Sequence, residues 1–119
     1  MSLMHMSMKN CVRVWTIMSE QKVASLLGLA QKAGKLASGE LSVEKVVRSG
    51  KAKVLIIAID SSESTKKGYR DMAAYYKVTL YEMLTKEQLG ACIGKVQRAA
   101  VAVVDEGFSD VIIKTLLDT

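Results

Sequence analysis

The sequence of 119 residues has no proline, one histidine, two cysteines and few aromatic residues. The lack of proline argues against a linker-rich or low-complexity chain, because such segments commonly depend on it. The two cysteines, Cys11 and Cys92, lie too far apart for a CxxC pair, and a disulfide framework normally uses more of them. A reducing, cytoplasmic location is therefore expected. No apolar run approaches the roughly 20 residues needed to cross a bilayer, so no membrane partner is expected.

The near absence of histidine argues against the catalytic and metal sites that depend on this residue. Because His5 is the only one, we expect no histidine base, catalytic triad or histidine-ligated metal site. Neither common nucleotide-binding motif, GxGxxG or GxxxxGK[ST], occurs. Cys92 lies in an apolar segment and is expected to pack rather than to act as a nucleophile. No cofactor and no catalytic residue are predicted.

Two aspartates leave one enzymatic alternative open. Asp60 and Asp105 each follow a predicted strand, where open α/β sheets usually place their ligands. Together they could bind a cation in a small metal-dependent enzyme. The favoured interpretation is that both carboxylates cap turns.

Half of the residues are hydrophobic, which is enough for one domain with an aliphatic core that needs no disulfide or metal. Residues 1–18 are set apart because methionines crowd them and a well-formed helix start follows. We expect this segment to be a cloning-derived or alternative-start extension, with the native start at Met18. Residues 19–119 are predicted to form a single domain.

Hydrophobic residues in this domain alternate between helical spacing and continuous apolar runs. The runs at 54–59 and 99–104 predict strands buried on both faces, and 78–81 predicts a shorter strand. Helices are expected after Ser19, after a short connection at 35–39, after the polar turn at 60–64, from Thr85 and around Phe108. This alternation predicts an α/β fold, a three-layer α/β/α sandwich around a small mixed sheet of about four strands.

Basic residues exceed acidic ones by 17 to 12, giving a net charge of +5 that favours an anionic partner. Several lie beside glycines or hydroxyl groups at the ends of predicted elements, where backbone N–H groups can meet phosphates. The best example is Gly39, which opens the second predicted helix. Solvated helix faces remain the alternative, and composition alone leaves RNA and a protein partner equally open.

Specific strings then point to a family. LGLAQKAGK at 27–35, GKAKVLIIAID at 50–60 and LGACIGKVQR at 89–98, followed by AVVD at 102–105, occur in this order without large gaps. Together they resemble the ribosomal protein L-seven-Ae / L-thirty-e superfamily, in particular its small bacterial members. The resemblance covers residues from about 20 to 117. It implies an α/β/α sandwich that binds kink-turn RNA, a sharply bent helix–bulge–helix element.

The resemblance also implies where RNA would bind. The family's motif Gly-x-Asn-Glu-x-x-Lys falls on Gly39 to Lys45, with Leu41 and Ser42 in place of the Asn and Glu that read base edges. The loop at 95–98 corresponds to the one that closes over the bulge, and the turn at 61–64 forms the third wall. The implied RNA-binding residues are Gly34, Lys35, Ser38, Gly39, Glu40, Lys45, Ser62, Glu63, Lys67, Lys95, Val96 and Arg98.

The function implied is a non-enzymatic, ribosome- or translation-associated protein that recognises kinked or bulged RNA. Its expected partners are structured RNA, ribosomal or otherwise, and ribosomal or other proteins. Because Leu41 and Ser42 depart from the family motif, a protein–protein interaction adaptor on the same fold remains the alternative. An exposed Leu41 beside a basic rim would suit such a contact.

Overall fold

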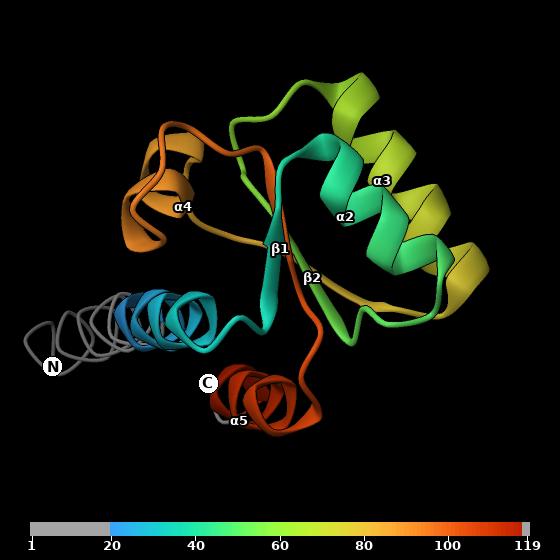
Figure 1. Ribbon diagram of the computed structural model, residues 1–119. Coiled ribbons are helices and arrows are strands. Elements are labelled where there is room, and N and C mark those ends of the chain that lie inside the picture. The colour runs from blue at the N-terminus through green and yellow to red at the C-terminus, as the bar shows by residue number, and fades with distance from the viewer. Residues whose placement is uncertain (1–19, 118–119) are drawn as a thin grey trace, which may run out of the picture.

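The computed structural model describes residues 20–117, in which helices cover both faces of a four-stranded sheet (Figure 1). Residues 20–32 are helical. The elements that follow are β1 (Leu36–Ser38), α2 (Glu40–Arg48), β2 (Val54–Ile57), α3 (Glu63–Tyr76), β3 (Thr79–Glu82), α4 (Lys86–Cys92), β4 (Ala100–Val103) and α5 (Glu106–Leu117). The predicted extension at 1–18 and the Ser19 helix cap lie outside the described residues. No helix in the described range is long and apolar enough to cross a membrane.

The sheet is mixed, with strand order β1-β4-β2-β3. β4 runs antiparallel to both β1 and β2, whereas β2 and β3 are parallel. In this register Val103 pairs with both Leu36 and Val54, the first residues of β1 and β2. The other three strands therefore all end where β4 begins. We call this the loop end of the sheet.

Alternating side chains divide the interior into two cores, as expected for strands buried on both faces. Val54 and Ile56 of β2 face a core that includes residues of the 20–32 helix, α4 and α5. Leu55 and Ile57 face a second core with α2 and α3. Figure 1 shows these helices on the two sides of the sheet, so the predicted three-layer sandwich is confirmed.

Local predictions are confirmed where short-range chemistry dominates. The Thr85 hydroxyl accepts a hydrogen bond from the Gln88 backbone N–H (3.1 Å), and the Gln88 side chain accepts one from the Thr85 N–H (2.8 Å). The predicted capping box of α4 is therefore present. Cys92 packs against the first core, donates its thiol to the Leu89 carbonyl (3.2 Å), and burial raises its pKa. These contacts agree with the packing role expected for this cysteine.

One element differs from expectation. Residues 35–39 were expected to be only a connection between helices, but they contain β1, which pairs with β4. Three residues are too few to produce a recognisable alternation of buried and exposed side chains. The strand forms because β4, more than 60 residues later in the chain, offers it an unpaired edge.

Candidate nucleic-acid interface

Three loops converge at the loop end of the sheet. They are the junction at Gly39 between β1 and α2, the segment 58–62 between β2 and α3, and the segment 93–99 between α4 and β4. The Ala99 carbonyl holds two of them together, because it accepts hydrogen bonds from the Ala58 N–H (2.8 Å) and the Ser61 hydroxyl (3.5 Å). Ser61 is buried by this contact. Ser38, next to Gly39, pairs with Val101 of β4, so the first segment lies beside the other two. The three segments that the resemblance implied as walls of one site are therefore neighbours.

Gly39 begins α2 in a conformation that side chains rarely adopt, with φ 90° and ψ 148°. Its carbonyl accepts the first helical hydrogen bond, from Val43 N–H at 2.9 Å. A glycine at this position has no side chain to cap the N–H groups of the first turn. These donors and the helix dipole together favour a negatively charged group at this point.

The loop at 93–99 is fixed against α4 by its backbone. The Lys95 N–H donates to the Gly90 carbonyl (2.8 Å), and the Arg98 N–H donates to the Lys86 carbonyl (3.0 Å). A Cβ atom on Gly90 would lie 2.0 Å from the Val96 carbonyl oxygen, so only glycine fits there. The role of Gly90 in seating this loop was not predicted from the sequence. A glycine inside a helical pattern was the available signal, because such a residue needs a packing reason.

The same loop presents apolar and cationic groups together. Val96 is 79% exposed, and Lys95 beside it is exposed as well. Arg98 is partly buried and donates from Nη1 to the Gln97 carbonyl (3.0 Å). Its Nε atom is buried and has no hydrogen-bond partner among the described residues. Leu41, in the first turn of α2, adds a second exposed aliphatic side chain with 83% of its surface accessible.

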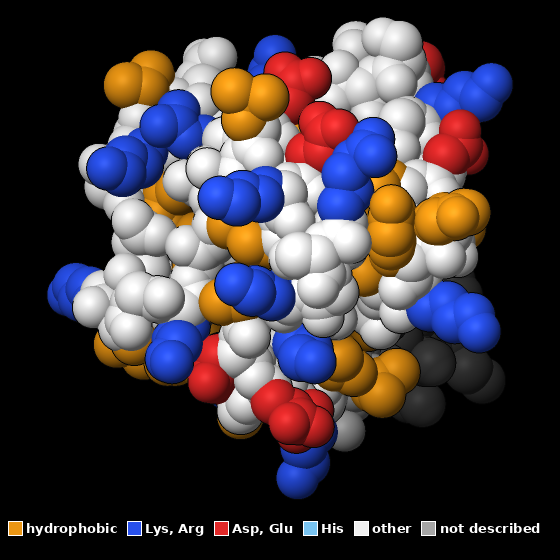
Figure 2. Space-filling view, turned by 45° about the vertical axis from the view of Figure 1, so that its right-hand side comes forward, with side chains coloured by type: hydrophobic (Ala, Val, Ile, Leu, Met, Phe, Trp, Pro, Cys, Tyr) orange, Lys and Arg blue, Asp and Glu red, His pale blue; other side chains and the backbone are white. Residues whose placement is uncertain are grey.

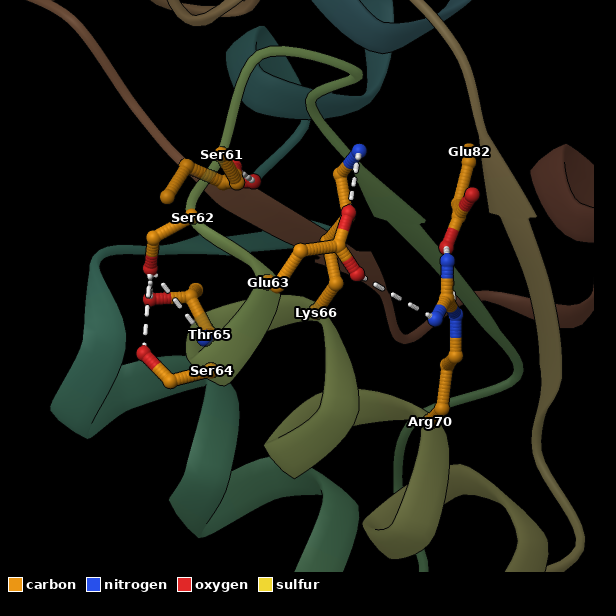
Figure 3. Close-up of polar contacts among 9 residues, drawn as sticks. Ser61, Ser62, Glu63, Ser64, Thr65, Lys66, Arg70 and Glu82 are labelled. Atoms are coloured by element: carbon orange, nitrogen blue, oxygen red, sulfur yellow. Dashed lines mark hydrogen bonds and ion pairs between the residues drawn. The ribbon is translucent and has the colours of Figure 1, made fainter.

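Ser62 and Glu63 lie at the loop end but are already engaged within the protein (Figure 3). The Ser62 hydroxyl caps α3 by accepting from the Thr65 N–H at 3.3 Å. The Glu63 carboxylate forms ion pairs with Lys66 (3.8 Å) and Arg70 (4.0 Å), and Arg70 also binds Glu82. These two predicted residues therefore shape the start of α3.

Lys45 and Lys67 are exposed on α2 and α3 and form no ion pair within the part of the chain that the structure describes. Lys45 lies one turn after Leu41 on the same side of its helix. Figure 2 turns the side of α2 and α3 toward the viewer. It shows Lys and Arg side chains spread over this face, with exposed hydrophobic side chains among them and smaller groups of Asp and Glu.

Two predicted site residues lie elsewhere. Gly34 and Lys35 precede β1 at the opposite end of the sheet, where the Lys35 carbonyl accepts a hydrogen bond from the Val104 N–H (2.9 Å). The three residues of β1 carry the chain about 10 Å from there to the loop end. Ser38 and Glu40 flank Gly39 and remain beside the three loops.

The two strand-end aspartates cap helices. Asp60 Oδ1 accepts from the Lys86 N–H at the start of α4 (2.8 Å), and Asp105 Oδ2 accepts from the Phe108 N–H in the first turn of α5 (2.9 Å). The interpretation of both residues as caps is thus confirmed. Within residues 20–117, no group of three or more His, Cys, Asp or Glu side chains is arranged to hold a metal ion.

Comparison with known proteins gives a consistent set of relatives. The chain is 40% identical to the RNA-binding protein YlxQ of Bacillus subtilis over 99 residues, which cover 83% of this chain and 99% of that protein. It is also 40% identical to the protein of the same name from Enterococcus faecium, over 76% of this chain and 87% of that one. The large ribosomal subunit protein eL30 of Yarrowia lipolytica is 35% identical, over 79% and 88% of the two chains.

A solved structure and a family match complete the comparison. A Bacillus halodurans protein described as having unknown function superposes with a TM-score of 0.76 at 35% identity, covering 80% of this chain and 96% of that one. Residues 21–113 match the Ribosomal protein L7Ae/L30e/S12e/Gadd45 family. The resemblance inferred from the sequence strings is confirmed, and the chain belongs to this family.

Proposed function

We propose that this protein binds RNA at the loop end of its sheet and recognises a kinked or bulged segment. The observation that carries the proposal is the convergence of the uncapped first turn of α2 with the basic, partly apolar loop at 93–99. The names of its relatives support it, since YlxQ is called an RNA-binding protein and eL30 a ribosomal protein.

The mechanism follows from the chemistry of the three loops. Backbone N–H groups after Gly39 meet a phosphate, and the exposed Lys45, Lys67 and Lys95, together with the partly buried Arg98, add salt-dependent attraction. Val96 and Leu41 pack against an unstacked base, because RNA is recognised mainly at bulges and loops where bases are accessible. With few aromatic side chains for base stacking, the site reads shape rather than a continuous single strand.

We infer a binding protein rather than an enzyme, acting in the cytoplasm in association with the ribosome or translation. Asp60 and Asp105 support this inference, because both carboxylates are engaged in capping helices. The charge of +5 and the ribosomal relatives support the association with RNA in translation.

Nuclear magnetic resonance mapping tests the location of the site. The isotope-labelled full chain is titrated with a short kink-turn RNA and, as a control, with a straight duplex of equal length. We expect the kink-turn RNA to shift the amide signals of 39–42, 59–62 and 94–98, with little change in α5. Shifts centred on the opposite end of the sheet, around Lys35 and Lys53, would contradict the proposed site.

A further inference from the structure

A groove of about 300 Å³ runs between α2 and α3, next to the loop end but outside the three loops. Glu40 and Glu44 line it from α2, and Gly68, Tyr69 and Met72 line it from α3. Glu40 forms no ion pair among the described residues. Glu44 pairs through Oε1 with Arg48 Nε at 2.9 Å. The residues that line the groove thus include two carboxylates and no lysine or arginine, in a chain whose net charge is positive, while Arg48 lines the adjoining hollow.

Tyr69 brings a polar group into the wall of this groove. The residue is only 6% exposed, and its hydroxyl forms no hydrogen bond with any residue that the structure describes. Burial, followed by the charges of Glu40 and Glu44, raises its pKa above 10.0. The hydroxyl oxygen is not one of the fully buried unpaired atoms among the described residues, so it opens onto the groove and can meet a group that enters from outside.

Gly68 keeps the groove open. It lies inside α3, where glycine is less favourable than alanine. Gly90 needs its lack of a side chain because the Val96 backbone lies against it, but a Cβ atom on Gly68 would meet nothing within 4 Å. The fold itself therefore does not require glycine at 68. What the glycine provides is room between the two helices.

The groove continues along α3 toward the other end of the helices. A second hollow shares Gly68 and Met72 with the first and reaches Tyr75, which is 79% exposed. The Tyr75 ring lies edge-on to that of Tyr76, with centroids 4.8 Å apart. Exposed tyrosines beside a groove are typical anchors of protein interfaces.

We propose that the groove between α2 and α3 docks a protein partner by receiving an arginine side chain from a cationic peptide segment. The planar guanidinium group suits the carboxylates of Glu40 and Glu44, because it offers several N–H donors in a fixed plane. The Tyr69 hydroxyl accepts a further hydrogen bond from the guanidinium group, and Met72 packs against the aliphatic part of the bound arginine side chain. RNA and the protein partner then occupy adjacent surfaces that meet at Glu40, which follows Gly39 at the start of α2.

The test uses the peptide acetyl-Gly-Arg-Gly-amide as probe and the same peptide with citrulline, which has the shape of arginine without its charge. Amide signals of the labelled full chain are followed during titration. We expect the arginine peptide to shift residues 40–44 and 64–72, and the citrulline peptide to have little effect. In the Glu44→Gln variant, the initial slope of these shifts against peptide concentration should fall about tenfold, because a charge-assisted contact is lost.

Gly68→Gln provides the second variant, because it fills the groove with a good helix former and touches none of the three loops. We expect it to abolish the response to the peptide while the protein stays folded and binds RNA as before. Three results would overturn the proposal: equal binding of the citrulline peptide, an unchanged response in Gly68→Gln, or equally strong shifts with spermidine. A dimer in sedimentation that Gly68→Gln dissociates would instead assign the groove to a second copy of this chain, and would also overturn it.

Discussion

Gly90 and Gly68 are both glycines within helices, but their surroundings differ completely. Gly90 faces the Val96 carbonyl so closely that no side chain fits, whereas Gly68 faces open space. The first glycine therefore positions the loop at 93–99, and the second leaves a surface free. At the scale of residues, the same amino acid serves internal packing in one helix and external access in another.

Gly90→Ala should distort this loop. The added methyl group would clash with the Val96 backbone, and overpacking of this kind costs about 1–3 kcal/mol. Gly68→Ala is the matched control, for which we expect a gain of up to about 1 kcal/mol because alanine favours the helix. Chemical denaturation measures both changes. Equal effects of the two substitutions would contradict the role given to Gly90.

Lys45→Ala and Arg98→Ala test the contacts with phosphate. Each should weaken RNA binding and reduce the slope of log K against log salt by roughly 0.7–0.9, because one released counterion is lost per contact. Lys53→Ala is the control, since this exposed lysine precedes β2 at the opposite end of the sheet. Lys35→Ala should behave like that control. Unchanged slopes for Lys45→Ala and Arg98→Ala would remove both residues from the site.

At the scale of elements, helix α4 connects two of the three loops. The Lys86 N–H at its start donates a hydrogen bond to the Asp60 carboxylate, in the segment after β2. The Lys86 carbonyl accepts one from the Arg98 N–H, in the segment before β4. The Thr85–Gln88 capping box holds the same end of the helix. The position of the loop at 93–99 therefore depends on how well α4 is capped.

Asp60→Ala should lower the free energy of unfolding by about 1 kcal/mol, the typical cost of losing a helix cap. Asp71→Ala serves as control, because this exposed aspartate on α3 forms no ion pair among the described residues. Thermal unfolding with and without magnesium is the readout. A rise in melting temperature with magnesium that Asp60→Ala abolishes would show that Asp60 binds a cation, contrary to its assignment as a cap.

Elements encoded by long or chemically distinct patterns could be predicted from the sequence. Buried runs such as 54–57 define strands by themselves, and the capping box marks the start of α4. β1 could not be predicted, because pairing with the distant β4 creates it. The same strand explains the limits of the predicted site. Lys35 and Gly39 are close in sequence, but β1 lies between them and places them at opposite ends of the sheet.

At the scale of the whole molecule, the two cores lie on opposite faces of one sheet, and the two proposed binding surfaces lie around the layer of α2 and α3. The loop end offers uncapped N–H groups and cations, whereas the groove along the same helices offers carboxylates. We expect this separation of charge to let one small domain hold RNA and a cationic protein segment at the same time.

Alkaline pH should lower the stability of the folded protein, because the Tyr69 hydroxyl then loses its proton. Its pKa is raised above 10.0 in the folded protein, so the folded state binds this proton more tightly than the unfolded state. The stabilisation is complete below about pH 10 and is lost as pH rises through the higher folded-state pKa. Compared with the wild type, Tyr69→Phe should show a smaller loss of stability as the pH rises above 10 through the raised folded-state pKa of Tyr69. Tyr75→Phe, at an exposed position, should keep the wild-type dependence.

The most direct test of the central claim compares a kink-turn RNA with a straight duplex of matched length, each titrated with the full chain at two salt concentrations. The account predicts tighter binding of the kinked RNA, with a preference that persists at the higher salt, because shape and loop contacts add to the attraction of charges. Equal binding of both RNAs that disappears at the higher salt would contradict it, and would reduce the loop end to a generic basic surface.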